Sequence, residues 1–192
     1  MCVMAHSPEP RPHSWEARLA AARSGDRGVW RSLFDELSPA VRGYLRLQGA
    51  ADPDDLASET FLAVFRGIEG FEGTSTQFRS WVFVIAHRRL IDERRRRSRA
   101  PLTELDPNAE LSTRDEVVAD DALGRLAIER IVALCERLAP DQRDVLLLRI
   151  VGDLTIEQIA DTVGKSIGAV KALQRRGLVA LEKFLTNEGV PL

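Results

Sequence analysis

The fold of this chain is constrained most by its single run typical of a β-strand, Trp81–Ile85, which continues into a helical pattern. A short apolar run is ambiguous alone, but a pattern that runs on well beyond strand length favours a helix. Elsewhere apolar residues recur at helical spacing, and no other segment predicts a strand. We therefore expect an all-α protein.

Start and stop residues of helices divide the first part of the chain. A residue that caps a helix start is followed by a glycine that ends it in three pairs: Ser14 with Gly25, Ser38 with Gly49, and Asp52 with Gly70. Pro39 and Pro53 fall in first turns, where the missing N–H of proline costs no hydrogen bond. We expect a new helix to begin at Ser38, and a helical domain over 15–99 after a tail, 1–14.

The net charge of −2 hides two adjacent blocks of opposite charge. Residues 77–99 contain eight arginines and two acids, whereas 100–122 contain seven acids and one arginine. Such asymmetry is more informative than the sum. The acidic block has two prolines and little apolar periodicity, so it predicts a linker over 100–120. We expect two small helical domains joined by this acidic linker, the second over 121–186, with a tail over 187–192.

Composition excludes several classes of protein. An apolar content of 44% and a charged content of 29% are typical of a globular chain. No apolar run approaches the ~18 residues of a membrane span, and residues 1–14 lack a stretch of signal-peptide length. Cys2 and Cys135 do not have metal-ligand spacing, and Cys135 is expected in the core, where free cysteine usually lies. We expect a protein of the reducing cytoplasm, without a metal or cofactor.

The segment LTIEQIADTVGKSIGAVKALQRRGL, residues 154–178, predicts a helix-turn-helix. Thr155 and Gln158 form the pattern of a capping box. Gly164 supplies the turn residue, and Ser166 can cap the second helix.

The second helix of this motif is expected to have an apolar side and a polar, cationic side. Its buried residues would be Ile167, Val170, Leu173 and Leu178, and its exposed residues Ser166, Lys171, Gln174, Arg175 and Arg176. Arg and Lys can read guanine and Gln can read adenine in the major groove. The alternative is a helical hairpin whose basic face is only solvated.

The segment WVFVIAHRRLIDERRRRSR, residues 81–99, predicts a helix that is buried at its start and cationic at its end. Arg88, Arg89 and Arg94–Arg97 would line the emerging part and contact phosphates. The polar loop Phe71–Gln77 before it could hold an unstacked base, as single-strand readers do. We expect His87 on the helix surface, contacting DNA or solvent. A solvated face or a localisation signal is the alternative.

Taken together, these segments resemble an extracytoplasmic-function (ECF) sigma factor, the smallest class of the sigma-70-like family. DPDDLASETFLAVFRGIEGF is similar to the helix that binds the clamp of core RNA polymerase. FRSWVFVIAHRRLIDERRRR resembles the promoter −10 helix, and LAPDQRDVLLLRIVGDLTIEQIADTVGKSIGAVKALQRRGLVAL resembles the −35 domain. The 15–99 domain thus resembles sigma region 2, and the 121–186 domain resembles sigma region 4.

The resemblance implies three groups of site residues. They are Asp54, Asp55, Glu59 and Leu62 for core polymerase, Arg88, Arg89, Asp92 and Arg95 for −10 DNA, and Ser166, Lys171, Gln174 and Arg175 for −35 DNA. This sequence departs from the family at Ser58, where many relatives have Gln, and at Arg88, where Asn is common.

The function that the resemblance implies is that of a dissociable initiation subunit. Its partners would be the β′ clamp and β flap of core RNA polymerase and promoter DNA, and the family's usual further partner is an anti-sigma factor. A separate hypothesis, motivated by the surplus of six acids over 100–122, is that the acidic linker threads towards the RNA path of the polymerase and mimics the charge of a nucleic acid. The main alternative is a stand-alone helix-turn-helix regulator. No paired carboxylates, nucleophile–base motif, phosphate loop or metal cluster favours an enzyme with a small-molecule substrate.

Overall fold

The computed structural model describes residues 14–99 and 130–187, and every regular element in these ranges is helical. The elements are α1 (Trp15–Arg23), α2 (Arg27–Leu47), α3 (Pro53–Gly67), the 3-10 helix η1 (Ile68–Gly70), α4 (Ser75–Arg99), a helix at 130–136, α6 (Pro140–Ile150), α7 (Ile156–Val163) and α8 (Ile167–Asn187). The all-α prediction is thereby confirmed. The predicted linker, 100–120, lies outside the described residues, as does nearly all of the two predicted tails, 1–14 and 187–192.

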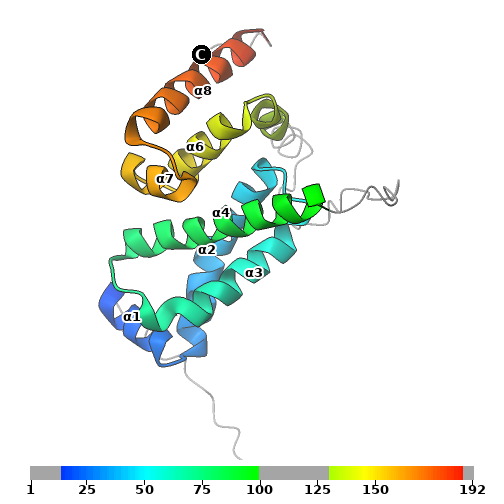
Figure 1. Cartoon of the computed structure of the whole chain (residues 1–192). Helices are drawn as coiled ribbons and strands as arrows, with labels where there is room; N and C mark the ends of the chain where they lie inside the picture. The colour runs from blue at the N-terminus through cyan, green and yellow to red at the C-terminus, as the bar shows by residue number, and fades with distance from the viewer. Residues whose placement is uncertain (1–13, 100–129, 188–192) are drawn as a thin grey trace, which may run out of the picture.

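Helix α4 lies at the centre of the molecule, between α2 and α3 on one side and α6–α8 on the other (Figure 1). Its central part is buried, and Val82, Phe83, Ala86 and Leu90 have no exposed surface. The ring of Tyr44 in α2 meets that of Phe83 edge-on, with centroids 5.6 Å apart. The apolar half of α4 therefore anchors the helix in the first domain, as the sequence predicts.

The predicted helix boundaries are confirmed at several termini. The side chains of Ser14 and Asp52 accept hydrogen bonds from backbone N–H groups in the first turns of α1 and α3. Gly25 and Gly49 have φ values of 83° and 74°, the left-handed conformation that glycine adopts without strain. These local signals determine where the helices of the first domain begin and end.

The predicted start of a new helix at Ser38 is wrong, because α2 runs unbroken through Pro39. Proline inside a helix removes a backbone hydrogen bond and costs roughly 3 kcal/mol. The helical spacing continues across it in four buried residues, Leu33, Leu37, Val41 and Leu45. Burial of each such side chain contributes roughly 1.5–3 kcal/mol, which offsets the cost of the proline. Tertiary packing thus overrides a strong local stop signal.

The second domain contains the predicted helix-turn-helix, formed by α7 and α8. Thr155 and Gln158 make both hydrogen bonds of the capping box at the start of α7. Gly164 has a φ of 65° and ends the helix in the left-handed conformation.

Cys135, in the helix at 130–136, is buried, as predicted, and this burial raises the pKa of its thiol.

Two predicted core residues of α8 are instead exposed, Ile167 by 43% and Leu178 by 47%. The reason is the close approach of α8 to α6 at Gly177, where a Cβ atom would lie 2.7 Å from Leu146 Cδ1. The helix is therefore turned so that Gly177 faces α6 together with Val170 and Leu173, which are buried as predicted. Because glycine carries no apolar side chain, the pattern of apolar residues misplaces the inner face.

The prediction that His87 lies on the helix surface is wrong, because its side chain is buried beneath the second domain. Its Nδ1 lies 2.8 Å from the Tyr44 hydroxyl, which accepts a 3.3 Å hydrogen bond from Gln48 Nε2. The Tyr44 hydroxyl can donate one hydrogen bond and accept two, so it can pair with Nδ1 of His87 whichever ring nitrogen carries the proton. Arg94 completes the chain by donating to Gln48 Oε1 at 3.0 Å. Buried polar groups joined in this way must be satisfied together.

We predict that His87 makes stability fall in mild acid. Burial lowers its pKa below the ordinary 6.5, opposed by Asp144 and reinforced by Arg94. The unfolded chain therefore binds a proton at higher pH than the folded chain does. Stability is full above about pH 6.5 and is lost as pH falls towards the folded pKa, by up to about 1.4 kcal/mol per pH unit.

Urea unfolding of the full chain between pH 8 and pH 5 measures this effect. His87→Gln should flatten the dependence above the range in which carboxylates titrate, whereas His13→Gln should retain it. An equal slope in the two variants would contradict the assignment to His87.

Candidate nucleic-acid interface

The outward face of α8 carries the residues predicted to read duplex DNA. Lys171, Gln174 and Arg175 lie at positions i, i+3 and i+4, which share one side of a helix. Lys171 and Arg175 are exposed, and Gln174 is half-buried. Ser166 is exposed too, and its hydroxyl accepts a 3.2 Å hydrogen bond from the Ala169 N–H, so it caps α8 as predicted. The structure thus brings all four residues to one end and side of the helix.

This face has an apolar component that the sequence pattern missed. Ile167 and Leu178 are exposed beside Lys171 and Gln174, because α8 is turned about its axis by the packing at Gly177. An exposed apolar side chain can contact the methyl group of thymine in the major groove. No signal in the apolar periodicity could have found these positions, since both residues fit the predicted inner face.

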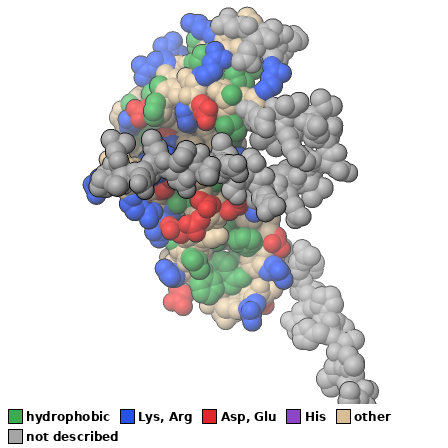
Figure 2. Space-filling view, turned by 90° about the vertical axis from the view of Figure 1, so that its right-hand side faces the viewer, with side chains coloured by type: hydrophobic (Ala, Val, Ile, Leu, Met, Phe, Trp, Pro, Cys, Tyr) green, Lys and Arg blue, Asp and Glu red, His purple; other side chains and the backbone are tan. Residues whose placement is uncertain are grey.

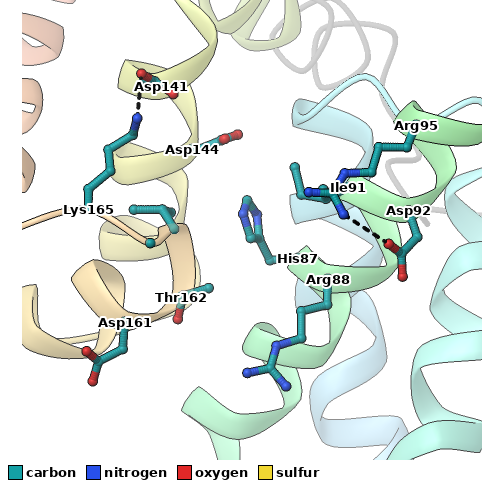
Figure 3. A pocket seen from close by; sticks show the side chains of 12 residues that line it. His87, Arg88, Ile91, Asp92, Arg95, Asp141, Asp144, Asp161, Thr162 and Lys165 are labelled. Carbon is teal, nitrogen blue, oxygen red and sulfur yellow. Dashed lines mark ion pairs between the residues drawn. The ribbon is translucent and has the colours of Figure 1, made fainter. Parts of the chain in front are cut away.

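A second cationic face lies on the C-terminal half of α4. Arg88, Asp92 and Arg95 are exposed at positions i, i+4 and i+7, and an ion pair of 3.9 Å joins Asp92 to Arg95. All three line a cleft of about 640 Å³, which His87 also borders (Figure 3). Arg89 is half-buried and does not line the cleft. The predicted −10 set is therefore brought together except for Arg89.

Arg94, from the predicted phosphate-binding run, is turned inward. Its Nη2 donates to the backbone carbonyl of Gln48 at 2.6 Å, in addition to the bond to Oε1. Its Nη1 lies 3.5 Å from Asp144 in α6. The guanidinium is therefore occupied by protein groups from α2 and α6.

The loop before α4 is held by side chains on both sides. Trp15 Nε1 donates to the Gly73 carbonyl at 2.6 Å, and the ring of Phe71 stacks on Trp81 with centroids 5.0 Å apart. Thr74 and Gln77 exchange side-chain-to-backbone hydrogen bonds and so cap α4. Hydroxyl and amide groups of residues 74–77 remain exposed. Phe71 itself is buried, so a base could contact the polar groups of the loop but not that ring.

A third surface, on α3, combines acids with apolar side chains. Asp55 is exposed, Glu59 is half-buried, and Asp54 lies 3.5 Å from Arg42. Leu62 and Phe65 are 55% and 53% exposed on the same helix. Figure 2 shows hydrophobic side chains gathered on the first domain, with acidic side chains beside them. Exposed apolar groups rimmed by charges are typical of a protein-binding surface.

The sequence analysis identified Leu62 on this surface but missed Phe65 and Phe34. Phe34 in α2 is 40% exposed and its ring packs edge-on against Phe61, with centroids 4.7 Å apart. The ring of Phe65 packs at a tilt against that of Trp30, with centroids 4.9 Å apart. A signal was available, because Leu62 and Phe65 are three residues apart on one helix face.

Other kinds of site have no counterpart in the parts of the chain that the structure describes. Within residues 14–99 and 130–187, no group of three or more His, Cys, Asp or Glu side chains is placed to hold a metal ion. None of the helices in these ranges has both the length and the apolarity needed to cross a membrane.

Two cationic helical faces in separate domains, with a protein-binding type of surface beside them, define a two-domain helical DNA-binding protein. Comparison with known families places it more narrowly. The family described as Sigma-70 region 2 matches residues 33–100, and Sigma-70, region 4 matches residues 128–181. The chain belongs to the ECF RNA polymerase sigma factors of the sigma-70 family.

Individual relatives support this assignment over most of the chain. The ECF RNA polymerase sigma factor SigL of Mycobacterium tuberculosis is 33% identical over 179 residues, which cover 91% of this chain and 98% of SigL. BldN of Streptomyces coelicolor, also an ECF sigma factor, is 32% identical over 174 residues, and the match spans 87% of this chain and 64% of BldN.

A solved structure has the same fold. CnrH, determined in complex with the cytosolic domain of CnrY, matches with a TM-score of 0.62 at 22% identity, over 89% of this chain and 96% of CnrH.

We predict that Lys171→Ala and Arg175→Ala each weaken specific binding to −35 duplex DNA roughly tenfold, since one good side-chain contact with a base contributes about 1–3 kcal/mol. Promoter binding by the protein assembled with core polymerase, measured by filter binding at fixed salt, tests this.

Lys183→Ala is the matched control, because Lys183 is an exposed cation of the same helix outside the face. An equal loss in all three variants would mean that α8 contributes only general charge.

Proposed function

We propose that this protein directs core RNA polymerase to specific promoters and starts transcription there. The first domain docks on the β′ clamp and captures the opened −10 strand. The second domain binds the −35 duplex and contacts the β flap. Membership of the ECF sigma factors supports this proposal. The domains extend over 15–99 and 121–186, and the segment 100–120 links them.

Each group of site residues has a role in this proposal. The core polymerase contacts are Asp54, Asp55, Glu59 and Leu62, the −10 contacts are Arg88, Arg89, Asp92 and Arg95, and the −35 contacts are Ser166, Lys171, Gln174 and Arg175. Arg89 would reach the strand from beside the cleft rather than from within it. Phe65 and Phe34 extend the polymerase surface.

The observation that carries the proposal is the exposed apolar and acidic surface on α3, in a domain separate from the helix-turn-helix. A stand-alone regulator would need the face of α8 but would leave that surface without a use. Exposed apolar side chains that lie together, as Leu62 and Phe65 do, are typical of a surface that a partner covers. Core polymerase is the partner that gives both domains a role.

The activity is one of binding and positioning, so we propose no catalytic residue and no cofactor. The protein would work in the cytoplasm, where RNA polymerase and the chromosome meet. An anti-sigma factor that covers the cationic and apolar faces is a further proposed partner. The solved complex of CnrH with CnrY supports this idea, since CnrH shares the fold.

Reconstitution with cognate core polymerase tests the proposal directly. The protein and core together should start transcription at a defined set of promoters, identified by sequencing transcript 5′ ends. The protein alone should bind those promoters weakly. Strong promoter binding without core, and no promoter-dependent transcript with it, would favour the stand-alone regulator.

We predict that Leu62→Ser reduces affinity for core polymerase roughly tenfold, because truncating an anchor side chain at a protein interface costs about 1–2 kcal/mol. Fluorescence titration of labelled protein with core measures this. Lys171→Ala is the reciprocal control and should leave core affinity unchanged. If Lys171→Ala weakened core binding and Leu62→Ser did not, the two surfaces would have to be exchanged.

A further inference from the structure

Helix α1 lies beside the loop that leads from η1 into α4, the loop that could hold an unstacked base (Figure 1). Trp15 Nε1 donates a hydrogen bond of 2.6 Å to the Gly73 carbonyl. From the other end of α1, Arg23 Nη2 donates to the Phe71 carbonyl, and its Nε donates to the Ile68 carbonyl at 3.4 Å. The backbone between α3 and α4 is therefore held at three carbonyls by two side chains that lie 45 to 58 residues earlier in the chain.

Packing of aromatic rings holds the inner side of the same loop. The ring of Trp15 lies 5.2 Å from that of Phe78 in α4, measured between centroids, and Phe71 lies 5.4 Å from Phe78. Phe71 and Phe78 are buried, so the inner side of the loop is apolar. Glu72 and residues 74–77 are exposed, so the outer side of the loop is polar. The indole of Trp15 thus packs beneath the loop and also bonds to its backbone.

The carbonyl bonds also set the direction of neighbouring backbone N–H groups. In a planar trans peptide the C=O and the N–H point in opposite directions. The Phe71 carbonyl is directed at α1, so the N–H of Glu72 is directed away from that helix. The same holds for the Gly73 carbonyl and the N–H of Thr74, which donates to Gln77 Oε1 at 2.8 Å. The orientation of these polar groups therefore depends on α1.

The loop is closely packed on itself at the point where Trp15 binds it. A Cβ atom at Gly73 would lie 2.8 Å from Gln77 Oε1 and 3.0 Å from the Phe71 ring. Loss of the indole N–H would leave the Gly73 carbonyl without this bond, so its peptide group could turn towards water. Such a turn would move the Thr74 N–H away from Gln77 and change the polar outer side of the loop.

We infer that Trp15 and Arg23 are positioning residues for −10 recognition, which hold the loop 71–77 in the conformation that binds an unstacked base. This inference rests on the proposed function. It gives a role to α1, which precedes the segment 33–100 that matches Sigma-70 region 2. A loop that is already ordered binds more tightly than one that must be ordered by its ligand. The effect is confined to the opened strand, because α3 and α8 carry the surfaces proposed for core polymerase and for the −35 duplex.

Two substitutions remove the bonds from α1, and each has a matched control. Trp15→Phe removes the indole N–H and keeps an aromatic ring. Trp30→Phe is its control, because Trp30 Nε1 makes an equivalent bond of 2.9 Å to the Ala22 carbonyl, which is not in the loop. Arg23→Gln removes the guanidinium, and its control is Arg27→Gln, which removes an exposed cation from the start of α2.

The test measures binding of forked DNA by each variant assembled with saturating core polymerase. The fork has a duplex −35 element and an unpaired −10 strand, taken from a promoter that transcript sequencing has identified. Each unpaired −10 base is removed in turn to leave an abasic site. With the unchanged protein, removal of the base that the loop holds should weaken binding about tenfold.

Trp15→Phe and Arg23→Gln should each bind the intact fork about fivefold more weakly, because the loop has lost a hydrogen bond that orders it. At the position where the unchanged protein shows the tenfold loss, removal of the base should cost these two variants little more. Trp30→Phe and Arg27→Gln should retain the full tenfold difference. Hydrogen exchange of the full chain without polymerase should be faster over residues 71–77 in Trp15→Phe than in Trp30→Phe.

Equal losses on the intact fork and on every abasic fork would overturn the inference, because they would indicate a general loss of stability or charge. Unchanged binding of the intact fork by Trp15→Phe, or equal exchange over residues 71–77 in Trp15→Phe and Trp30→Phe, would overturn it too. So would a loss of core affinity as large as the loss on the fork. If the unchanged protein bound all abasic forks as tightly as the intact one, the proposed capture of the −10 strand would itself fail, and the exchange measurement would show separately whether α1 holds the loop.

Discussion

Burial of the central part of α4 is the interaction on which the rest of this molecule depends. Val82, Phe83, Ala86 and Leu90 fix the helix between the two domains, with no surface left exposed. A helix of 25 residues is too long to be covered throughout by such a small domain, so its cationic end extends from the core as a rigid rod. Each cationic side chain on that end is thereby placed relative to the core, instead of sampling space as a tail would.

His87 lies at the boundary between these two halves. Its bond to Tyr44 satisfies a buried polar group where the apolar stripe of α4 ends, and the chain continues through Gln48 to Arg94. One row of polar contacts thus connects the first domain's interior to the charged contact with Asp144. Because a partly satisfied buried network is costly, the arrangement of α2, α4 and α6 is coupled at this point.

Much of the fold could be predicted from the sequence, because capping residues and glycines act through nearby backbone groups. The ends of α1 and α3 and the turn at Gly164 are of this kind. Pro39 shows the limit, since a local stop signal was overridden by packing far from it in sequence. The orientation of α8 about its own axis depends on Gly177, because this glycine packs closely against Leu146 of α6. Which face of a helix is inward is a tertiary property, and periodicity indicates it only when the contact is made by large apolar side chains.

The candidate sites show the same difference between what local sequence determines and what tertiary packing determines. The sequence brought Lys171, Gln174 and Arg175 together correctly, because positions on one helix face follow from helical geometry alone. It could not separate Arg94 from its neighbouring arginines, nor find His87 in the interior. Burial of a polar residue depends on which partners satisfy it, and those partners, Gln48 and Asp144, lie far away in the chain.

The close fit of Gly177 against Leu146 has an evolutionary consequence. Val170, Leu173 and Gly177 determine how deeply α8 sits on its own domain, whereas Lys171 and Arg175 take no part in that packing. Under the proposed function, substitutions on the outer face change which promoters are bound without altering where the helix lies. A lineage could redirect this protein to new target genes by drift at a few outward positions, while the inward glycine stays under strict selection.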